Sequence, residues 1–310
     1  MSHAYSYLNR LIDDAARHAD SVVAVVYPCD ALALRASFAV AARGLARVLL
    51  VGPKALIAQT ALDSDIDLSH FEIVDTPDDP MAAAQTAAAL VAEGRAQLLM
   101  KGCLHTEELM GVLVSREAGL RTSRRISHAF VFDIPDVARP LMLTDCVVNI
   151  EPDLLVKRDI VQNAIDLAQA IGVAHPLVGI LSATEAVNPA IRGTVDAAAL
   201  CKMAERGQIT GGELDGPLAF DNAISAESAR IKKIASRVAG SPDVLLVPNL
   251  ETGNTLYKSL VYLGHAECAG VVLGTRVPVV LTSRADSEFS RLASAALGVL
   301  YASKPHALAA

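Results

Sequence analysis

Short apolar runs alternate with amphipathic stretches along the first hundred residues. The run Val22–Tyr27 is rich in β-branched residues and has no polar alternation, which is typical of a parallel strand buried on both faces. Between such runs, apolar residues recur every three to four positions, which predicts helices. The predicted strands are 22–27, 48–51, 71–74 and 98–100, and the predicted helices are 5–18, 30–43, 54–61, 80–93 and 107–116. This alternation predicts a parallel sheet with helices on both faces.

The pattern changes after residue 128. Two apolar runs, 129–134 and 141–148, follow each other with only a proline-flanked turn between them. Two successive strands without a helix indicate a departure from simple winding, and we place a domain crossover there. The alternation then resumes, with predicted strands at 177–181, 244–247, 270–273 and 277–281 and predicted helices at 160–171, within 190–204, from 225, up to 263 and at 286–301.

Composition narrows the class of protein. The chain has 310 residues, enough for two domains, and its formal net charge of −7 argues against nucleic acid as a partner. Five cysteines without a CxxC pair favour reduced thiols in a cytoplasmic protein over a disulfide framework. The first twenty residues lack the pattern of a signal peptide. The apolar runs are shorter than the ~20 residues that span a bilayer, so we expect a cytoplasmic protein without a membrane partner.

Candidate chemistry is densest near the end of the chain. The apolar run 277–282 stops at Ser283-Arg284-Ala285-Asp286, where a helical pattern begins. A hydroxyl, a guanidinium and a carboxylate therefore follow a predicted strand, at the edge where open α/β sheets bind ligands and where a helix N-terminus attracts anions. A plain strand-to-helix turn capped by a serine or an aspartate would have the same pattern. The residues alone leave both interpretations open.

Two earlier segments carry groups that bind anions. The strand 98–100 opens onto Lys101–Thr106, where His105 and Thr106 could hold a phosphate, although Thr106 could equally be only the N-cap of the next helix. The basic loop, residues 119–125, follows. It contains the arginines Arg121, Arg124 and Arg125. Planar guanidinium groups suit phosphate oxygens, and a solvated surface loop is the alternative interpretation.

A glycine-rich segment, 207–217, is a further candidate. Its four glycines permit unusual backbone angles and a close approach of the backbone to a ligand, and we single out Gly211 and Gly212. Neither the dinucleotide motif GxGxxG nor the phosphate-binding motif GxxxxGK[ST] occurs in the chain.

Several of these segments, taken together and in order, resemble the phosphate acetyl/butyryl transferases. The resemblance runs over nearly the whole chain. It is carried by KGCLHTEEL at 101–109, GLRTSRRISHAF at 119–130, ITGGELDGPLAFDNAIS at 209–225, VPNLETGN at 247–254 and LTSRADS at 281–287. It implies a phosphate acyltransferase that interconverts a short-chain acyl-CoA (acetyl-CoA or butyryl-CoA) and phosphate with an acyl phosphate and CoA. Coenzyme A is then a substrate, and no cofactor is expected.

The resemblance also implies a fold and partners. We expect two α/β/α domains with parallel-rich sheets and an interdomain cleft, similar to the isocitrate and isopropylmalate dehydrogenases. The first domain would combine both chain ends, 1–142 and 286–310, and the second, 143–285, would form a homodimer. An acyl-phosphate product further implies metabolic coupling to an acetate or butyrate kinase.

Residue roles follow from the same resemblance. Ser283 and Arg284 match the family's SR motif at the active site. The acetyl branch places an aspartate several residues later, where this chain has Ser290, so Asp286 is our candidate for the base. Asp286 would accept the thiol proton, Ser283 would orient the thiol, and Arg284 would stabilise the oxyanion. The phosphate and CoA would be bound by His105, Thr106, Arg121, Arg124, Arg125, Gly211 and Gly212, without a metal.

Two other functions stay open at this stage. A decarboxylating hydroxy-acid dehydrogenase with NAD(P) would need a metal held by aspartates such as Asp145, Asp215 and Asp221, whose surrounding sequences fit no such pattern. A non-catalytic sensor of acyl-CoA or acyl phosphate would keep the fold without turnover.

Overall fold

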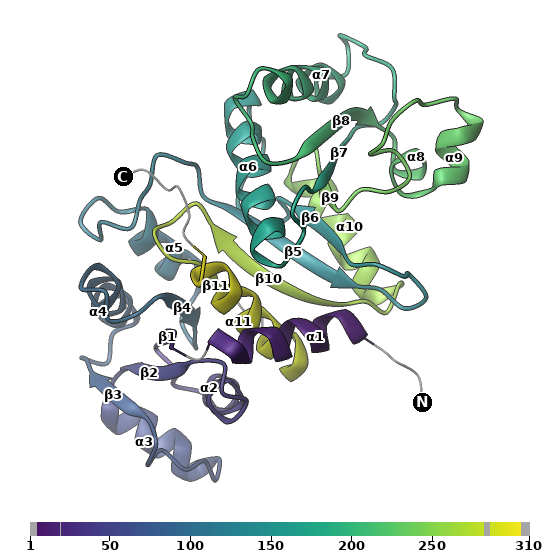
Figure 1. The fold of residues 1–310 in the computed structure, drawn as a ribbon. Coiled ribbons are helices and arrows are strands. Elements are labelled where there is room, and N and C mark those ends of the chain that lie inside the picture. Colours follow the sequence, from purple (N-terminus) through teal and green to yellow (C-terminus); the bar gives the residue numbers. More distant parts are fainter. Residues whose placement is uncertain (1–4, 19, 282–285, 305–310) are drawn as a thin grey trace. The chain divides into compact units, whose positions relative to one another are not determined.

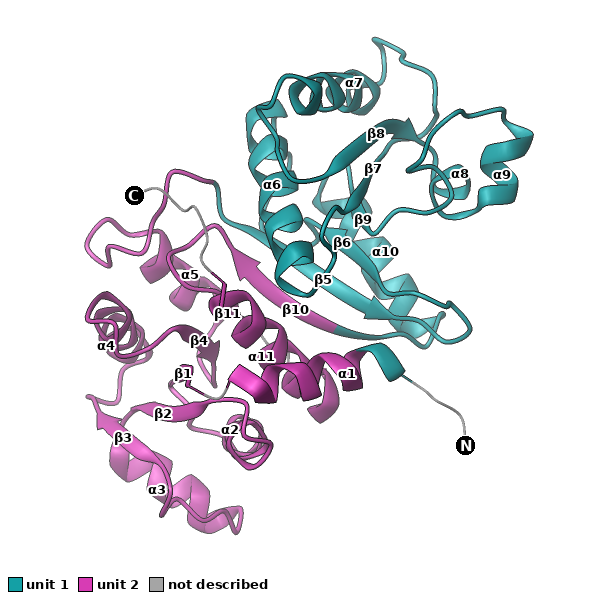
Figure 2. Cartoon of the chain, viewed as in Figure 1, with its two compact units in different colours: residues 1–7, 125–268 teal, residues 8–124, 269–310 magenta. Residues whose placement is uncertain are grey.

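The computed structural model describes residues 5–18, 20–281 and 286–304. The chain divides into two compact units, which Figure 2 shows in different colours. Unit 1 consists of residues 1–7 and 125–268, and unit 2 of residues 8–124 and 269–310. The chain thus changes units at 7/8, 124/125 and 268/269, whereas the domain boundaries expected from the sequence fall at 142/143 and 285/286.

The strands of unit 2 form the parallel arrangement that the sequence predicts. Their order is β3-β2-β1-β4-β11-β10, and only the pairing of β10 with β11 is antiparallel. The bounds are β1 Val22–Val26, β2 Arg47–Gly52, β3 Glu72–Asp75, β4 Leu98–Lys101, β10 Glu267–Leu273 and β11 Val279–Val280. Every residue of β1 is buried, as expected of a strand covered on both faces.

Helices cover both faces of these strands. Helices α4 and α5 contact each other on one side of β1 and β4, whereas α2 and α11 pack together on the other side (Figure 1). The bounds are α1 Ser6–Ala15, α2 Ala31–Ala42, α3 Lys54–Asp63, α4 Pro80–Ala92, α5 Thr106–Val114 and α11 Glu288–Ala302, with a short 3₁₀ helix, Ala16–His18, after α1. This is the layered arrangement that buries apolar stripes on both faces of a parallel sheet.

Unit 1 contains a second α/β layer with mixed pairing. Its strand order is β5-β6-β9-β7-β8, in which β5 and β6 are antiparallel and the remaining pairs are parallel. The strands are β5 Ser127–Asp133, β6 Leu141–Thr144, β7 Leu177–Leu181, β8 Glu213–Leu218 and β9 Val244–Leu246. The helices are α6 Leu154–Ala170, α7 Arg192–Glu205, α8 Phe220–Ile224, α9 Ala226–Ile231 and α10 Leu250–Tyr262. The predicted α/β class is confirmed in both units.

Three local predictions in unit 1 are wrong. Strand β6 ends at Thr144 rather than at residue 148, because the Asp145 carboxylate accepts backbone N–H groups of the following turn. Helix α6 begins six residues before the predicted start, capped by Asp153, which accepts from the amide of Val156 at 2.9 Å. Strand β8 lies largely within the glycine-rich segment, where no strand was predicted.

The charged start of α6 explains why its first turns were missed. Lys157 is 5% exposed and donates to the carboxylate of Asp196 on α7 at 2.7 Å. A charged residue in a first turn is typical of a solvated surface, so the sequence pattern gave no apolar stripe there. In the structure, ion pairing replaces apolar side chains in the buried face of this helix.

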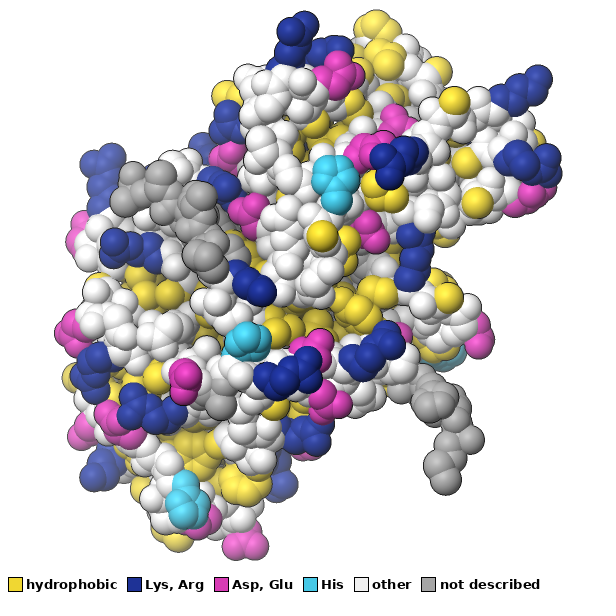
Figure 3. Space-filling model, in the orientation of Figure 1, with side chains coloured by type: hydrophobic (Ala, Val, Ile, Leu, Met, Phe, Trp, Pro, Cys, Tyr) yellow, Lys and Arg dark blue, Asp and Glu magenta, His cyan; other side chains and the backbone are white. Residues whose placement is uncertain are grey.

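Basic side chains do not gather in one large patch on the face of the molecule shown in Figure 3, where they are scattered among acidic ones. Within the residues that the structure covers, no helix is long and apolar enough to cross a membrane.

Candidate active site

The carboxyl ends of three unit 2 strands lie at one edge of the sheet. In the parallel register, Val26 at the end of β1 is paired with Lys101 at the end of β4. On the other side of β4, Val280 at the end of β11 is paired with Met100. The segments that follow β1, β4 and β11 therefore leave the sheet side by side. Ligands of open α/β sheets bind at this kind of edge.

Two of these segments are packed backbone against backbone. The amide of Gly102 donates to the carbonyl of Val26 at 2.8 Å, and the amide of Cys103 donates to the carbonyl of Tyr27 at 2.8 Å. A Cβ atom on Gly102 would lie 2.5 Å from the oxygen of Val26 and 2.6 Å from that of Tyr27. Only glycine fits there, and the start of the loop after β4 is fixed by this contact.

The predicted anion-binding residues of that loop stand at the start of α5. His105 is the N-cap, and its amide donates to the Glu108 carboxylate at 2.6 Å. Thr106 is the first residue of the helix, so the interpretation of Thr106 as N-cap is wrong. The side chains of His105 and Thr106 are both exposed, while Leu104 before them and Leu109 after them are buried. Two exposed polar side chains thus lie at a helix N-terminus whose neighbouring leucines are buried.

The segment after β11 contains the SR motif. Ser283 and Arg284 lie outside the described residues, and the chain is described again from Asp286, which is half-buried. Ser287 caps α11 by accepting from the amide of Ser290 at 3.0 Å. The register of β11 places the entry to the SR motif beside the segment after β4.

A buried arginine lies next to this motif. Arg291, in the first turns of α11, is 4% exposed, and its Nε donates to the carbonyl of Asp286 at 3.4 Å. Burial lowers the pKa of the Arg291 guanidinium, and the nearby carboxylates of Asp286, Asp30 and Glu288 act in the opposite direction. Asp30 is the N-cap of α2, the helix that follows β1. The sequence analysis missed Arg291.

The unit 2 part of the basic loop is attached to the turn between β10 and β11. Leu120, fully buried, accepts from the amide of Arg276 at 2.9 Å, and Arg121 forms an isolated antiparallel bridge with Thr275. Thr122 donates its hydroxyl to the carbonyl of Gly274 at 2.7 Å. Residues 120–122 thus run alongside this turn as a short antiparallel segment.

The unit 1 part of the basic loop is attached to α6. The amide of Arg125 donates to the Asp159 carboxylate at 3.0 Å, and the carbonyl of Arg125 accepts from Nδ2 of Asn163 at 2.9 Å. Asp159 is 8% exposed and Asn163 is fully buried, whereas the Arg125 side chain is exposed. Both polar groups of the Arg125 backbone are therefore held by buried side chains, which the sequence analysis did not single out.

Gly211 and Gly212 pack against α6. A Cβ atom on Gly211, which has φ +86°, would lie 2.8 Å from Nε2 of Gln169. A Cβ atom on Gly212 would lie 2.8 Å from the carbonyl oxygen of Pro176. Gln169 also donates to the carbonyl of Gly211 at 3.0 Å. These contacts account for the two glycines by local packing, and their part in binding a substrate stays a prediction.

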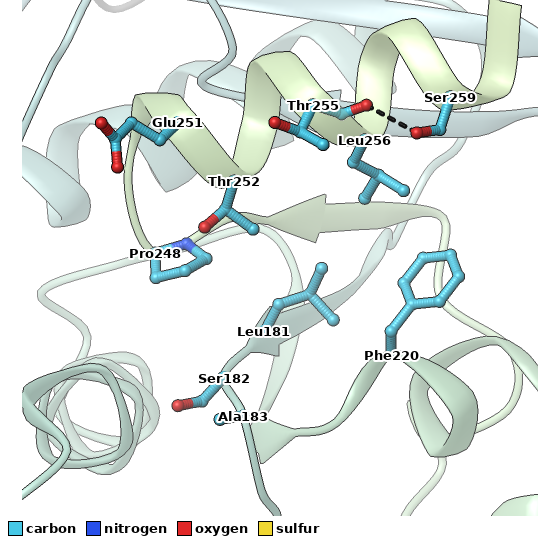
Figure 4. A pocket seen from close by; sticks show the side chains of 10 residues that line it. All are labelled: Leu181, Ser182, Ala183, Phe220, Pro248, Glu251, Thr252, Thr255, Leu256 and Ser259. Atoms are coloured by element: carbon cyan, nitrogen blue, oxygen red, sulfur yellow. Dashed lines mark hydrogen bonds between the residues drawn. The ribbon is translucent and has the colours of Figure 1, made fainter. Parts of the chain in front are cut away.

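Unit 1 has a concave site of its own, shown in Figure 4. It is a cavity of about 600 Å³ at the carboxyl ends of β7 and β9. Leu181, Phe220 and Leu256 form its apolar wall, and the hydroxyl groups of Ser182 and Thr252 lie beside it. This size is typical of pockets that take small organic molecules.

The described side chains hold no metal centre, and the thiol of Cys29 at the unit 2 edge is not activated. Within the described ranges, no group of three or more His, Cys, Asp or Glu side chains could hold a metal ion. Burial raises the pKa of the Cys29 thiol, in the segment after β1, to about 12, which keeps it neutral near pH 7. An attack by Cys29 on an acyl group would therefore be disfavoured.

Comparisons with known proteins identify the family. Residues 81–299 match the family described as phosphate acetyl/butaryl transferase. The chain is 55% identical to a phosphate acetyltransferase of Rhizobium meliloti over 302 residues, covering 97% of this chain and 95% of the relative. It is 44% identical to a phosphate butyryltransferase of Clostridium acetobutylicum over 259 residues, covering 84% of this chain and 86% of the relative.

Solved structures agree with this result. A branched-chain phosphotransacylase from Enterococcus faecalis superposes with a TM-score of 0.80 at 30% identity, covering 92% of this chain and 99% of that one. A 4-hydroxythreonine-4-phosphate dehydrogenase from Klebsiella pneumoniae superposes with a TM-score of 0.56 at 13% identity, covering 91% and 99%. The second similarity shows only that the fold resembles that of such dehydrogenases.

This chain belongs to the phosphate acetyl/butaryl transferase family. It is an acyltransferase that acts with phosphate, as the motifs in its sequence predict. The expected fold class is confirmed by the same comparisons.

Proposed function

We propose that the chain transfers a short acyl group between coenzyme A and phosphate at the carboxyl edge of the unit 2 strands. The observation that carries the proposal is the register of β4 between β1 and β11, which brings the segment with His105 and Thr106 beside the entry to the SR motif. Family membership supplies the reaction, and the register supports its assignment to this edge of unit 2.

The transfer needs a base that accepts the thiol proton and a positively charged group that stabilises the oxyanion. A thiol has a pKa of about 8.5, so the CoA thiol is mostly protonated at pH 7 and needs a proton acceptor. Asp286 accepts this proton while the sulfur attacks the acyl carbonyl carbon. Arg284 stabilises the negative charge that develops on the carbonyl oxygen, and Ser283 orients the thiol. The carbon–oxygen bond to phosphate then breaks, and phosphate leaves with the electron pair.

Phosphate is bound through groups that suit its oxygens. Arg121, Arg124 and Arg125 offer guanidinium forks, and His105 and Thr106 stand at the N-terminus of α5. The exposure of Arg121 and Arg125 leaves their side chains accessible to a ligand, which supports this assignment. Gly211 and Gly212 belong to the proposed CoA- and phosphate-binding set on the strength of their motif alone.

The proposal extends to substrate size, assembly and location. An acetyl or butyryl group fits best, because the relatives named above include both kinds of transferase. We place the enzyme in the cytoplasm, which the free state of its five cysteines supports. A homodimer formed through the predicted second domain, 143–285, and an acetate or butyrate kinase that uses the product complete the proposal. Analytical ultracentrifugation tests the dimer.

The function is tested by phosphate-dependent release of free thiol from acetyl-, propionyl-, butyryl- and isobutyryl-CoA. We expect release only with phosphate present, and the ranking of rates identifies the acyl group. Ser283→Ala and Arg284→Ala should each lower kcat by roughly 10²–10³ with little change in the KM for acyl-CoA.

Ser182→Ala is the matched control, because it removes a hydroxyl that lines the unit 1 cavity and leaves the proposed site intact. Thiol release without phosphate, or wild-type rates in both the Ser283 and the Arg284 variants, would contradict the proposal. An absence of release with all four acyl-CoAs would point instead to a sensor.

A further inference from the structure

The Thr122 hydroxyl lies between the two arginines of the basic loop that belong to unit 2. It donates to the carbonyl of Gly274 at 2.7 Å and accepts from the amide of Arg124 at 3.1 Å. A hydroxyl has a single proton, so the direction of both bonds is fixed by their partners. One atom thus ties the basic loop to the β10–β11 turn and also fixes the backbone at Arg124.

The bond from the Arg124 amide gives the loop its local shape. A threonine oxygen that accepts from the amide two residues later closes a small turn, which sets the backbone direction at the second residue. Arg121, on the other side of Thr122, is held by its bridge to Thr275, whose side chain is 1% exposed. Both arginines therefore receive their backbone positions from contacts centred on Thr122 and its partner turn.

The turn that receives Thr122 also leads to the SR motif. Gly274 follows β10 directly and has φ +85°, in the left-handed region that favours glycine. Five residues later the chain enters β11, which pairs with β4 at Val279 and Leu99 and continues toward residue 283. The Thr122 hydroxyl bond to Gly274 therefore joins the backbone of the basic loop to the segment that leads into the SR motif.

We propose that Thr122 is a positioning residue for phosphate, holding Arg121 and Arg124 at a fixed place relative to the β10–β11 turn and thereby to the start of β11. This inference rests on the proposed function, because it takes these arginines as phosphate ligands. Thr122 itself need not touch the substrate. Its contribution comes from ordering the arginines before phosphate arrives, so that less conformational freedom is lost on binding.

The test compares the wild type with four variants. Thr122→Val keeps the branched shape and removes both hydrogen bonds, and Thr122→Ser keeps the hydroxyl. Thr86→Val is the matched control in the same unit, because the Thr86 hydroxyl also donates to a backbone carbonyl, that of Ala82, at 2.8 Å. Thr122→Ala repeats the test without the valine side chain if Thr122→Val does not fold.

Two readouts are measured for each variant. Kinetics give kcat and the KM values for phosphate and acyl-CoA, and the rise in Tm with added inorganic phosphate reports binding without turnover. Loss of two hydrogen bonds should raise the KM for phosphate about tenfold in Thr122→Val and reduce the phosphate-induced rise in Tm. The KM for acyl-CoA should change less than about twofold, and Thr122→Ser and Thr86→Val should resemble the wild type.

Several results would overturn the inference. If the wild type turns over acyl-CoA but the KM for phosphate is unchanged in Thr122→Val and Thr122→Ala, this inference is overturned and the proposed function is not. Equal increases in both KM values would overturn it too, because they indicate a general disturbance rather than a lost phosphate ligand. A wild type that neither turns over acyl-CoA nor gains stability from phosphate would overturn the proposed function together with this inference.

Discussion

An aspartate near the carboxyl edge of unit 1 and one near that of unit 2 differ in burial. At the unit 1 edge, Asp145 follows β6 and is 3% exposed. Its carboxylate accepts from the amides of Val147, Val148 and Asn149 and from the Asn149 side chain, at distances from 2.7 to 3.2 Å. In unit 2, Asp286 is half-buried and follows the SR motif by two residues in the sequence.

The difference shows that a polar residue after a parallel strand is not sufficient to indicate a reactive group. Burial raises the pKa of the Asp145 carboxyl, while its hydrogen bonds act in the opposite direction. Those bonds build the turn that ends β6, so this aspartate has a structural task. Asp286, just before α11, has a chemical task only in the proposed mechanism.

The largest expected effects come from two single variants, in each of which one of these aspartates is replaced by asparagine. Asp286→Asn removes the proposed base and should lower kcat by roughly 10²–10⁴. Asp145→Asn places an amide group where a carboxylate oxygen accepts N–H groups, and should lower the free energy of unfolding by about 1–3 kcal/mol. Thiol-release kinetics and chemical denaturation measure the two effects separately.

The comparison fails if the two variants behave alike. Equal losses of stability would mean that Asp286 is also a structural residue. A kcat close to that of the wild type in Asp286→Asn would remove it as the base, and the search would move to another proton acceptor near the SR motif.

How far the sequence predicts this molecule depends on the kind of residue. Strand β1 was predicted nearly to the residue, because a short β-branched run between turns has few other interpretations. Strand β8 was missed because glycine and proline within it are typical of loops. Its place beside β7 is set by long-range packing, which a local pattern does not contain.

The candidate site follows the same rule. Ser283, Arg284 and the basic loop could be proposed because they lie in segments that resemble those of a known family. Asp159 and Asn163 could not, because each looks like an ordinary polar residue of a helix surface. Their function appears only when α6 is seen to hold the backbone of Arg125.

A smaller change in activity and stability is expected from substituting two glycines, Gly102 just before α5 and Gly111 within it. Gly102→Ala would bring a Cβ atom to 2.5 Å from the Val26 carbonyl oxygen at the active edge. Overpacking against backbone should cost about 1–3 kcal/mol of unfolding free energy and disturb the loop that carries His105. Gly111, inside α5, has nothing within 4 Å of its Cβ position. Gly111→Ala should stabilise the protein by about 0.5–1 kcal/mol.

Thermal and denaturant unfolding of both glycine variants gives the measurement. Opposite signs are the expected result, and a loss of activity should accompany Gly102→Ala alone. If Gly102→Ala unfolds at the same denaturant concentration as the wild type, the backbone contact between the segments after β1 and β4 does not fix the edge.

Acid sensitivity should come from a buried histidine in unit 1. His128 on β5 is 1% exposed, its ring lies 4.3 Å from that of Phe130, and its Nδ1 has no hydrogen-bond partner among the described residues. Burial lowers the pKa of His128 from 6.5 to about 3. Between these values the unfolded chain binds a proton that the folded chain does not, so stability falls as the pH falls.

At pH 5 this difference should cost the wild type about 2 kcal/mol relative to pH 7. His128→Leu removes the titrating ring and keeps an apolar side chain of similar size, so its unfolding free energy should depend less on pH over this range. Denaturant unfolding at pH 7, 6 and 5 measures both slopes, and the aspartate at the same edge titrates equally in both proteins. Parallel slopes for wild type and variant would show that His128 is not the source of the acid sensitivity.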